Sequence, residues 1–328
     1  MKKRQALYFD APYHVSVRDE EISAPAAGQA LVRMTLSAIS AGTEMLFYRG
    51  QFPQEMDVDA SITSLEEESG YPLKYGYCAV GIIEELGAGV DANWLGKRIF
   101  SFQPHQSHFV AEVGALFEIP AEISDEDAVF LPNMETAVNL VMDAHPVLGE
   151  RVIVFGQGIV GLLTASLLRQ FPLERLVVVD PVLMRREAAL ALGVDTVFTP
   201  EEIAEDDFDL ALELSGVPVA LNAAVERVGF AGRVIVGSWY GQKPVSLNLG
   251  GRFHRERIKL ISSQVSTIAP KFSGPWDKAR RFRVVWEMLG RVKPSQWISS
   301  QIPLREADQA YATLDTRPQD VLQIIFKY

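Results

Sequence analysis

The fold is decided by the stretch Val152-Ile153-Val154-Phe155-Gly156-Gln157-Gly158-Ile159-Val160-Gly161. Its β-branched and apolar residues lead into three glycines spaced as G-x-G-x-x-G, and the apolar segment from Leu162 to Leu168 follows as a predicted helix. A second apolar run, Leu176 to Val179, is followed by Asp180, which lies 19 residues beyond the third glycine (180 − 161). This order of strand, glycine-rich turn, helix, strand and acid is typical of a dinucleotide-binding βαβ unit.

Each glycine of this turn has a physical role in holding a dinucleotide. Gly156 permits a tight turn, Gly158 lets the backbone approach a pyrophosphate, and Gly161 lets helix and strand pack closely. The free N–H groups at the start of the helix, together with its dipole, favour the negative charge of the pyrophosphate. A glycine-rich turn also serves purely structural joins, but the complete βαβ context favours a cofactor site. We predict that this site is formed by Gly156, Gln157, Gly158, Ile159, Val160 and Gly161.

Asp180 decides which dinucleotide is favoured. A carboxylate at the end of the second strand accepts hydrogen bonds from the ribose hydroxyls of NAD and repels the 2′-phosphate of NADP. Arg185 and Arg186 act in the opposite direction, because a nearby arginine neutralises the acid or binds a phosphate. The sequence therefore favours NAD(H), with NADP(H) as the alternative.

Length, composition and charge limit the class of protein. A chain of 328 residues, of which 48% are hydrophobic and 22% charged, predicts two globular domains with sizeable cores. The net charge of −11 argues against non-specific binding to nucleic acid and favours a soluble protein. We expect no membrane partner, because no apolar run approaches the ~20 residues that span a bilayer and no signal-peptide pattern is present. The single cysteine, Cys78, rules out a disulfide framework within the chain, so a reducing cytoplasm is the expected location.

The pattern of predicted elements changes near Asp125. Short alternating segments before it indicate strands, and the polar, acidic stretch from Gln51 to Gly70 indicates a surface excursion. Strands alternate with helices over residues 126–265, which predicts an α/β domain with a doubly wound parallel sheet. The last strand has no obvious partner in that sheet, so we expect the C-terminal tail to return to the first domain. We predict a β-rich catalytic domain over residues 1–125, completed by residues 266–328.

Small and polar residues follow three further predicted strands of the parallel sheet. In open α/β sheets, ligands bind in the crevice beyond the carboxyl ends of the strands. Glycine and serine also dominate ordinary turns, but their shared placement at strand ends favours cofactor contacts. The predicted residues are Ser215, Gly216, Gly237, Ser238, Trp239 and Ser263.

Over essentially its whole length, the chain resembles the medium-chain dehydrogenase/reductase superfamily. The segment Ala38 to Glu44 stands in place of that family's Gly-x-Cys-Gly-Thr-Asp, and Gly76 to Gly81 in place of Gly-His-Glu-x-x-Gly. Arg305 to Tyr311 resembles its Leu-Glu-x-Ala-x-x-Ala-(Phe/Tyr). Ile39 to Glu44, with Gly70 to Leu73, is similar to the bacteriochlorophyllide hydroxyethyl dehydrogenase branch. The resemblance implies a Rossmann domain, a β-rich GroES-like catalytic domain, a nicotinamide cofactor and a homodimer.

The chain departs from this family at the zinc ligands. Ala41 stands in place of the cysteine ligand, and Tyr77 and Cys78 stand in place of the histidine and glutamate. The region of the third ligand, Leu131 to Thr136, has no cysteine, and the four cysteines of the structural zinc lobe are missing. A catalytic zinc takes about three nitrogen, sulfur or oxygen ligands, so the resemblance implies a zinc-free member. The open alternative is an improvised metal site built from His105, His108, Glu44 and Cys78.

Without zinc, a side chain must stabilise or protonate the substrate oxygen. Tyr77 replaces a ligand that faces the substrate in the family, and its phenol either donates a hydrogen bond to a carbonyl or only fills the vacated metal pocket. His105 and His108 are candidate proton carriers near neutral pH, with surface-loop histidines as the alternative. The resemblance gives Glu44 an orienting role and places Thr136 against the nicotinamide ring.

These residues predict a zinc-independent, NAD(H)-dependent oxidoreductase that interconverts a secondary alcohol and a ketone. One alternative is an NADPH-dependent reductase of the quinone or enoyl type, because zinc-free members of the superfamily often reduce activated double bonds. A second alternative is a dinucleotide-binding sensor or accessory protein without catalysis. The small-molecule substrate is not identified by the sequence, because the substrate pocket is built from the regions where the family match is weakest.

Overall fold

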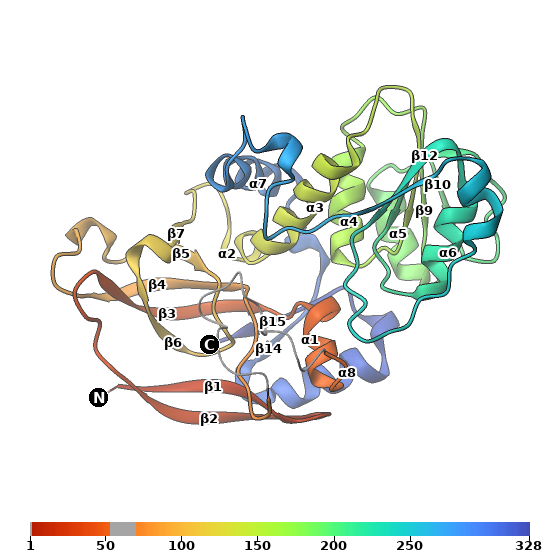
Figure 1. Cartoon of the computed structure of the whole chain (residues 1–328). Coiled ribbons are helices and arrows are strands. Elements are labelled where there is room, and N and C mark those ends of the chain that lie inside the picture. The colour runs from red at the N-terminus through yellow and green to blue at the C-terminus, as the bar shows by residue number, and fades with distance from the viewer. Residues whose placement is uncertain (1, 53–69) are drawn as a thin grey trace. The chain divides into compact units, whose positions relative to one another are not determined.

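The computed structural model describes residues 2–52 and 70–328 (Figure 1). The chain forms two compact units, of which the first comprises Met1–Pro132 and Lys293–Tyr328 and the second Asn133–Val292. The predicted surface excursion from Gln51 to Gly70 lies almost entirely outside the described residues. No helix within the described parts of the chain is both long enough and apolar enough to span a membrane.

The second unit contains a six-stranded parallel sheet with the order β10-β9-β8-β11-β12-β13. The strand order reverses between β8 and β11, which is the feature that opens a ligand crevice in doubly wound sheets. The predicted doubly wound parallel sheet is therefore confirmed. Its strands are β8 (Arg151–Phe155), β9 (Arg175–Val179), β10 (Thr196–Phe198), β11 (Phe208–Glu213), β12 (Val228–Val236) and β13 (Lys259–Ser262).

The helices of the second unit are α3 (Leu131–Ala144), whose first two residues belong to the first unit, α4 (Ile159–Leu168), α5 (Leu183–Ala191), α6 (Pro218–Arg227) and α7 (Lys278–Val292). Helix α4 is apolar around almost its whole circumference, and every residue except Val160 is buried. A helix of this kind belongs inside a domain. Because α4 directly follows the glycine-rich turn, the packing of this helix also holds the turn in place.

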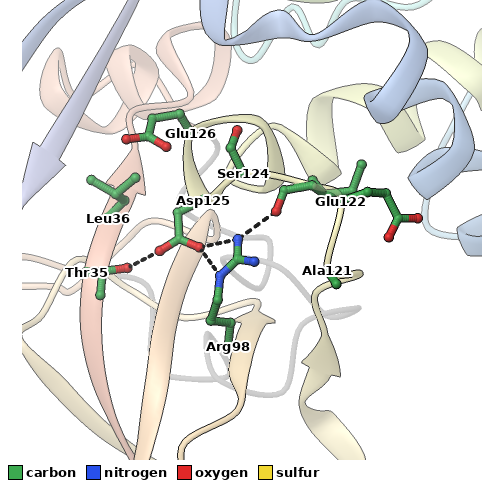
Figure 2. A pocket seen from close by; sticks show the side chains of 9 residues that line it. Thr35, Leu36, Arg98, Ala121, Glu122, Ser124, Asp125 and Glu126 are labelled. Atoms are coloured by element: carbon green, nitrogen blue, oxygen red, sulfur yellow. Dashed lines mark hydrogen bonds and ion pairs between the residues drawn. The ribbon is translucent and has the colours of Figure 1, made fainter.

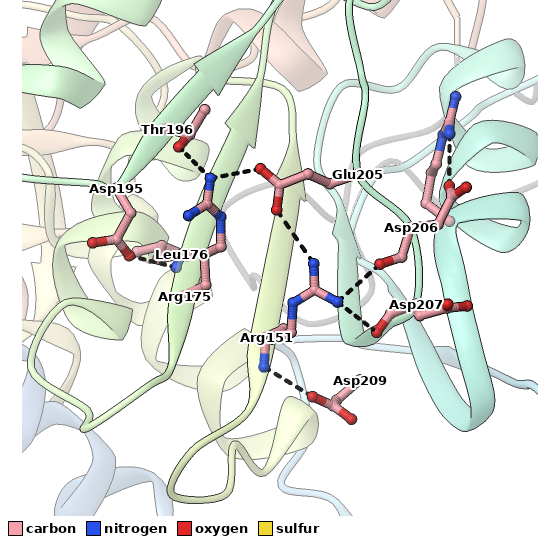
Figure 3. Close-up of polar contacts among 10 residues, drawn as sticks. Arg151, Arg175, Leu176, Asp195, Thr196, Glu205, Asp206, Asp207 and Asp209 are labelled. Atoms are coloured by element: carbon pink, nitrogen blue, oxygen red, sulfur yellow. Dashed lines mark hydrogen bonds and ion pairs between the residues drawn. The ribbon is translucent and has the colours of Figure 1, made fainter.

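Ion pairs hold the amino edge of this sheet (Figure 3), opposite to the carboxyl ends of the strands, where ligands generally bind in sheets of this kind. Arg151 and Arg175, the first residues of β8 and β9, both reach Glu205, at 3.3 and 2.6 Å. The backbone N–H of Arg151 donates to Asp209 Oδ2 at 2.9 Å, and that of Leu176 donates to Asp195 Oδ2 at 2.7 Å. These contacts tie the connections before β10 and β11 to the sheet.

The first unit is β-rich, as expected. Its seven-stranded sheet has the order β14-β15-β3-β4-β5-β7, with β6 paired to β3, and a separate antiparallel pair is formed by β1 and β2. The strands are β1 (Lys2–Ala11), β2 (His14–Ile22), β3 (Gln29–Ala38), β4 (Ala79–Leu86), β5 (Arg98–Ser101), β6 (His108–Glu112), β7 (Phe117–Glu118), β14 (Ile298–Pro303) and β15 (Gln323–Lys327). The expected return of the C-terminal tail is seen in the pairing of β15 with β3, where Ile325 lies opposite Ala38.

An aromatic core joins the helices of the first unit to its sheets. The helices are α1 (Ala41–Tyr48), α2 (Asp125–Ala128) and α8 (Ala307–Thr316). Tyr311 of α8 packs edge-on against Phe9 with ring centroids 5.2 Å apart, and it stacks on Tyr48 at 5.5 Å. Phe47 stacks on Tyr75 at 4.1 Å. This packing fixes α1, which carries part of the candidate site.

The sequence pattern predicts a helix from Glu126 to Asp143 with an interruption at Pro132, and the observed break falls earlier. The break lies between α2 and α3, and Pro132 sits in the first turn of α3 instead of in the break. A proline in the first turn is tolerated because its missing N–H would have no partner within the helix. The two compact units divide after residues 132 and 292, whereas the pattern predicted boundaries after 125 and 265. Helix α7 lies in the second unit, where its Arg281 bonds to Glu135 of α3 at 2.6 Å.

We predict that shortening one buried side chain of α4 destabilises the protein. Leu163 is completely buried, so Leu163→Ala should lower the free energy of unfolding by about 2–5 kcal/mol through lost burial and the cavity that remains. Urea denaturation followed by circular dichroism measures this change. Leu148→Ala is the matched control, because Leu148 is 77% exposed and its truncation should have little effect. Equal effects of the two variants would contradict this account of α4.

Candidate functional site

The glycine-rich turn has the geometry that a dinucleotide requires. Gly156 has φ +92°, and a Cβ atom there would lie 2.7 Å from the backbone of Ser215. A Cβ atom on Gly161 would lie 2.0 Å from the carbonyl oxygen of Gly156. At Gly158, in contrast, nothing lies within 4 Å of the Cβ position, so the start of α4 is open to an approaching group. The residues present therefore fit a pyrophosphate at this helix N-terminus.

Asp180 holds this turn from the end of the neighbouring strand. Its carboxylate is buried and accepts hydrogen bonds from the backbone N–H groups of Gln157, at 2.7 Å, and Val182, at 2.8 Å. Each oxygen keeps a further lone pair that can accept from a ribose hydroxyl. Arg186 donates to the carbonyl oxygen of Asp180 at 2.7 Å, and Arg185 Nη1 lies 3.9 Å from the carboxylate. The acid and both arginines therefore lie together, as the sequence suggested.

Glu213, the last residue of β11, was not among the predicted cofactor residues, although it directly precedes the segment that carries Ser215 and Gly216. This carboxylate is completely buried and accepts from the backbone N–H and hydroxyl of Ser215, at 2.7 and 2.5 Å, and from Gly216 N at 3.1 Å. Its other oxygen accepts from the Tyr240 hydroxyl at 2.7 Å. Gly216 N also donates to Ser238 Oγ at 2.8 Å. Glu213 thus joins the segments after β11 and β12, which carry the predicted residues Ser215, Gly216 and Ser238.

The other predicted cofactor residues occupy three different environments. A Cβ atom on Gly237 would lie 2.5 Å from Leu140 Cδ2, so this glycine serves close packing against α3. Ser263 directs its hydroxyl to Asp143 Oδ2, at 2.7 Å. Trp239 is 41% exposed after β12, and Thr136 is half-buried on α3. Direct contact of these residues with the cofactor stays a prediction.

The first unit contains a buried polar cluster centred on Glu44, in the first turn of α1. Glu44 Oε1 accepts from Ser40 N at 2.6 Å, and Oε2 lies 3.0 Å from His105 Nε2 and accepts from the Tyr311 hydroxyl. His105 Nδ1 lies 2.7 Å from Ser37 Oγ. Both Glu44 and His105 are completely buried, so the alternative of a surface-loop histidine is wrong for His105. The orienting role implied for Glu44 agrees with these contacts.

Tyr77 contacts the side chain of Ser40, whereas Glu44 contacts its backbone. Its hydroxyl is hydrogen-bonded to Ser40 Oγ and lies 3.4 Å from Thr43 Oγ1. The side chain is only half-buried, unlike that of His105. Burial raises the pKa of the Tyr77 phenol above its ordinary value, so the group stays protonated at neutral pH and remains a hydrogen-bond donor. Tyr77, Glu44 and His105, which are far apart in sequence, are thus brought together.

His108 does not join this cluster. It begins β6, where its Nε2 lies 3.7 Å from Glu84 Oε2 and its Nδ1 lies 3.0 Å from Ser107 Oγ. Burial lowers the pKa of His108, although Glu84 acts against this. The structure therefore separates the two histidines that the sequence analysis placed side by side.

Among the residues that the structure describes, the donor set does not fit a catalytic zinc. Across residues 2–52 and 70–328, no group of three or more histidine, cysteine, aspartate and glutamate residues is arranged to hold a metal ion. Ala41 offers no ligand, and burial raises the pKa of the Cys78 thiol, which disfavours the thiolate that zinc needs. The improvised site is not assembled, because His108 pairs with Glu84.

A pocket of about 600 Å³ lies elsewhere in the first unit (Figure 2). Its central pair is Arg98 and Asp125, with Arg98 Nε 2.7 Å from Asp125 Oδ1. Arg98 also donates to the carbonyl oxygen of Ile123 at 2.6 Å, and Thr35 donates to Asp125 at 3.1 Å. None of the predicted site residues lines this pocket. Arg98 and Asp125 form an ion pair with each other, and we assign the pocket no role.

No protein-family model matches the chain. Sequence similarity to dehydrogenases nevertheless extends over its full length. D-guloside 3-dehydrogenase of Escherichia coli (strain K12) is 22% identical over 350 residues, which cover 99% of both chains. The 2-desacetyl-2-hydroxyethyl bacteriochlorophyllide A dehydrogenase of Cereibacter sphaeroides is 25% identical over 341 residues, which cover 98% of both chains.

Solved structures share the fold over the whole chain. The E. coli CFT073 protein rspB, described as a short chain alcohol dehydrogenase and solved with NADH, has a TM-score of 0.81, 18% identity and 99% coverage of both chains. A dehydrogenase of Sinorhizobium meliloti 1021 bound to NADP has a TM-score of 0.79, 16% identity and 100% coverage of both chains. These likenesses establish a Rossmann domain combined with a GroES-like domain.

The similar proteins are zinc-type alcohol dehydrogenases and other medium-chain dehydrogenase/reductases, including the bacteriochlorophyllide branch. The predicted resemblance to this superfamily is therefore confirmed. So is the prediction of an NAD(P)-dependent oxidoreductase of the medium-chain type.

We predict that Gly156→Ala weakens cofactor binding. The new methyl group would meet the backbone of Ser215, and the residue would be forced to keep a positive φ, so the turn should shift. The Kd for NADH, measured by fluorescence titration, should rise at least tenfold. Gly114→Ala is the control, because nothing lies within 4 Å of its Cβ position. Unchanged NADH affinity in a folded Gly156→Ala protein would show that this turn does not hold the cofactor.

Proposed function

We propose that the protein is a zinc-independent, NAD(H)-dependent oxidoreductase that interconverts a secondary alcohol and a ketone. The observation that carries the proposal is the hydroxyl group of Tyr77, which is bonded to Ser40 and stands where the family has a metal ligand. The full-length relatives support an alcohol or sugar hydroxyl as the reacting group, since they include D-guloside 3-dehydrogenase. We further propose a homodimer, on the resemblance alone, and a cytoplasmic location, on the single cysteine of the chain.

In this proposal the second unit holds the cofactor. The start of α4 binds the pyrophosphate, and Asp180 accepts from the adenosine ribose hydroxyls. The segments joined by Glu213 form part of the crevice wall. When bound, the dinucleotide supplies or accepts the hydride at its nicotinamide ring. The carboxylate of Asp180 is the reason for preferring NAD to NADP, because a 2′-phosphate beside it would be repelled.

The first unit supplies the acid and base chemistry. In ketone reduction, the Tyr77 hydroxyl donates a hydrogen bond to the carbonyl oxygen and passes its proton to that oxygen as the hydride arrives at carbon. Ser40 Oγ is bonded to the same phenol; it passes its hydroxyl proton to the phenolate and takes up a proton from solvent water in its place. Alcohol oxidation follows the reverse path. Glu44 and His105 act as positioning residues, because Glu44 holds the backbone of Ser40 and His105 holds Glu44.

The first test is turnover in the presence of a metal chelator. We expect NADH to appear at 340 nm when the protein is given NAD with a panel of secondary alcohols, polyols and glycosides in EDTA. Activity that EDTA abolishes and zinc restores would contradict zinc independence. No turnover with alcohols, but reduction of enones or quinones by NADPH, would favour the double-bond reductase. NADH binding without turnover in either direction would favour a sensor or accessory protein.

We predict that Tyr77→Phe lowers kcat by about 100-fold or more, the usual contribution of a positioned general acid. The variant keeps the ring and loses only the hydroxyl that contacts Ser40 and Thr43. NADH affinity should be unchanged, which separates a chemical defect from a folding defect. Tyr13→Phe is the control, because Tyr13 is 51% exposed and lies outside the cluster. A Tyr77→Phe enzyme with normal kcat would remove Tyr77 from the mechanism.

The pH dependence of ketone reduction tests the state of the same phenol. Because its pKa is raised, the acid form of Tyr77 persists to higher pH than an ordinary phenol does. Its ionisation should therefore cause no loss of kcat/KM for the ketone below pH ~10, the ordinary phenol pKa. A fall in kcat/KM well below that pH that Tyr77→Phe abolishes would show that the phenol ionises earlier than we propose.

Asp180→Asn tests the preference for NAD. The amide no longer repels a 2′-phosphate, so the ratio of kcat/KM for NADH to that for NADPH should fall about tenfold or more. Asp195→Asn is a matched control, because Asp195 also accepts from a backbone N–H but at the amino edge of the sheet. An unchanged ratio in Asp180→Asn would contradict the role of this carboxylate in choosing the cofactor.

A further inference from the structure

Three polar side chains form a buried ladder on one face of α3. Glu135, Asn139 and Asp143 are spaced four residues apart, which places them above one another on the helix. Asn139 Nδ2 donates to Asp143 Oδ2 at 3.0 Å and to Ser263 Oγ at 3.1 Å. Ser263 Oγ itself donates to Asp143 Oδ2 at 2.7 Å. The ladder therefore binds the first residue after β13.

Arg281 of α7 closes the ladder at its other end. Its Nη2 donates to Glu135 Oε1 at 2.6 Å, and its Nη1 donates to Asn139 Oδ1 at 2.8 Å. The same guanidinium also donates to the backbone carbonyl oxygens of Val265, at 2.6 Å, and Thr267, at 3.3 Å. Only 1% of Arg281 is exposed. One side chain thus joins α7, α3 and the segment that leaves β13.

The chemistry of this contact requires arginine. Residues 263–267 have neither helical nor strand structure, so their backbone carbonyl groups need partners from elsewhere. A guanidinium offers five N–H donors in a planar fork, whereas an ammonium is a compact point charge. Arg281 uses the fork to reach two side chains and two carbonyl groups at once. A buried charge destabilises a protein unless it is paired and hydrogen-bonded, and the partners of Arg281 meet both conditions.

We propose that Arg281 is a positioning residue that sets the affinity for the dinucleotide. It holds residues 263–267, which leave the carboxyl end of β13, at the sheet edge that carries the glycine-rich turn and the Glu213 segments. The ladder also fixes α3, on which Thr136 follows Glu135. A segment that is already ordered loses less conformational entropy when a ligand binds, so the cofactor binds more tightly. This inference rests on the proposed function, because it takes the crevice to hold NAD(H).

The test compares Arg281→Lys with the wild-type full-length protein. Lysine keeps a positive charge beside Glu135 but cannot bond all four partners. We expect the Kd for NADH to rise about tenfold, as for a binding segment that must be ordered by its ligand, while kcat changes far less. Hydrogen exchange of the peptide covering residues 263–272 should increase in the cofactor-free protein. Arg291→Lys is the matched control on the same helix, because Arg291 is exposed and pairs with the exposed side chains of Glu287 and Gln170.

Unchanged NADH affinity and unchanged exchange in Arg281→Lys would overturn the proposal. A loss of affinity with wild-type exchange in residues 263–272 would also overturn it, because Arg281 would then act by another route. If Arg281→Lys does not fold, Arg281→Met combined with Glu135→Leu removes both buried charges and should show the same two effects. A wild-type protein that binds no NADH would contradict the proposed function. The exchange comparison would still decide whether Arg281 holds the segment.

Discussion

The carboxylate of Asp180 accepts the backbone N–H of Gln157 at 2.7 Å, and the geometry of the glycine-rich turn depends on this bond. Glu213 repeats the arrangement at the end of β11, with Ser215 N and Gly216 N as donors, and Glu44 repeats it in the first unit with Ser40 N. Burying a carboxylate is costly, and charge-assisted hydrogen bonds from N–H groups offset that cost. Each of these carboxylates consequently fixes a turn that regular secondary structure does not reach.

The parts of the fold that depend on local sequence signals were predictable. Apolar runs predicted the strands of the parallel sheet in the second unit, and the glycine spacing predicted the turn at Gly156. The pairing of the C-terminal tail was predicted because its strand had no obvious partner in the parallel sheet. The break before α3 was misplaced, because Pro132 disrupts a helix interior but not a first turn. A sequence pattern readily shows whether a residue lies in a helix or a strand. It shows less readily which residues from distant parts of the chain that residue contacts.

The polar anchors of both units were not predictable for that reason. Arg281 meets Glu135, and Tyr311 meets Glu44, across large separations in the chain. Charged residues at helical spacing usually indicate a solvated face, and α7 carries several basic residues besides Arg281. The spacing of Glu135, Asn139 and Asp143 was visible in the sequence as a polar stripe on a largely apolar helix. A polar stripe that is buried requires hydrogen-bond partners. The stripe on α3 was therefore the feature of the sequence that could have pointed to a polar partner such as Arg281.

The hydrogen bonds around Glu44 also distinguish proton transfer from positioning. A carboxylate only accepts, so His105 Nε2 must carry the hydrogen in its contact with Glu44, and Ser37 and Tyr328 complete the chain on the other side of the ring. This chain does not continue to Tyr77 through exchangeable hydroxyl groups, because Glu44 reaches Ser40 by its backbone N–H. A backbone amide holds its proton, so the Glu44 and His105 pair can orient the Ser40 turn without relaying protons. In the proposed mechanism, the hydroxyls of Tyr77, Ser40 and Thr43 are therefore the groups of this cluster that pass a proton to the substrate oxygen.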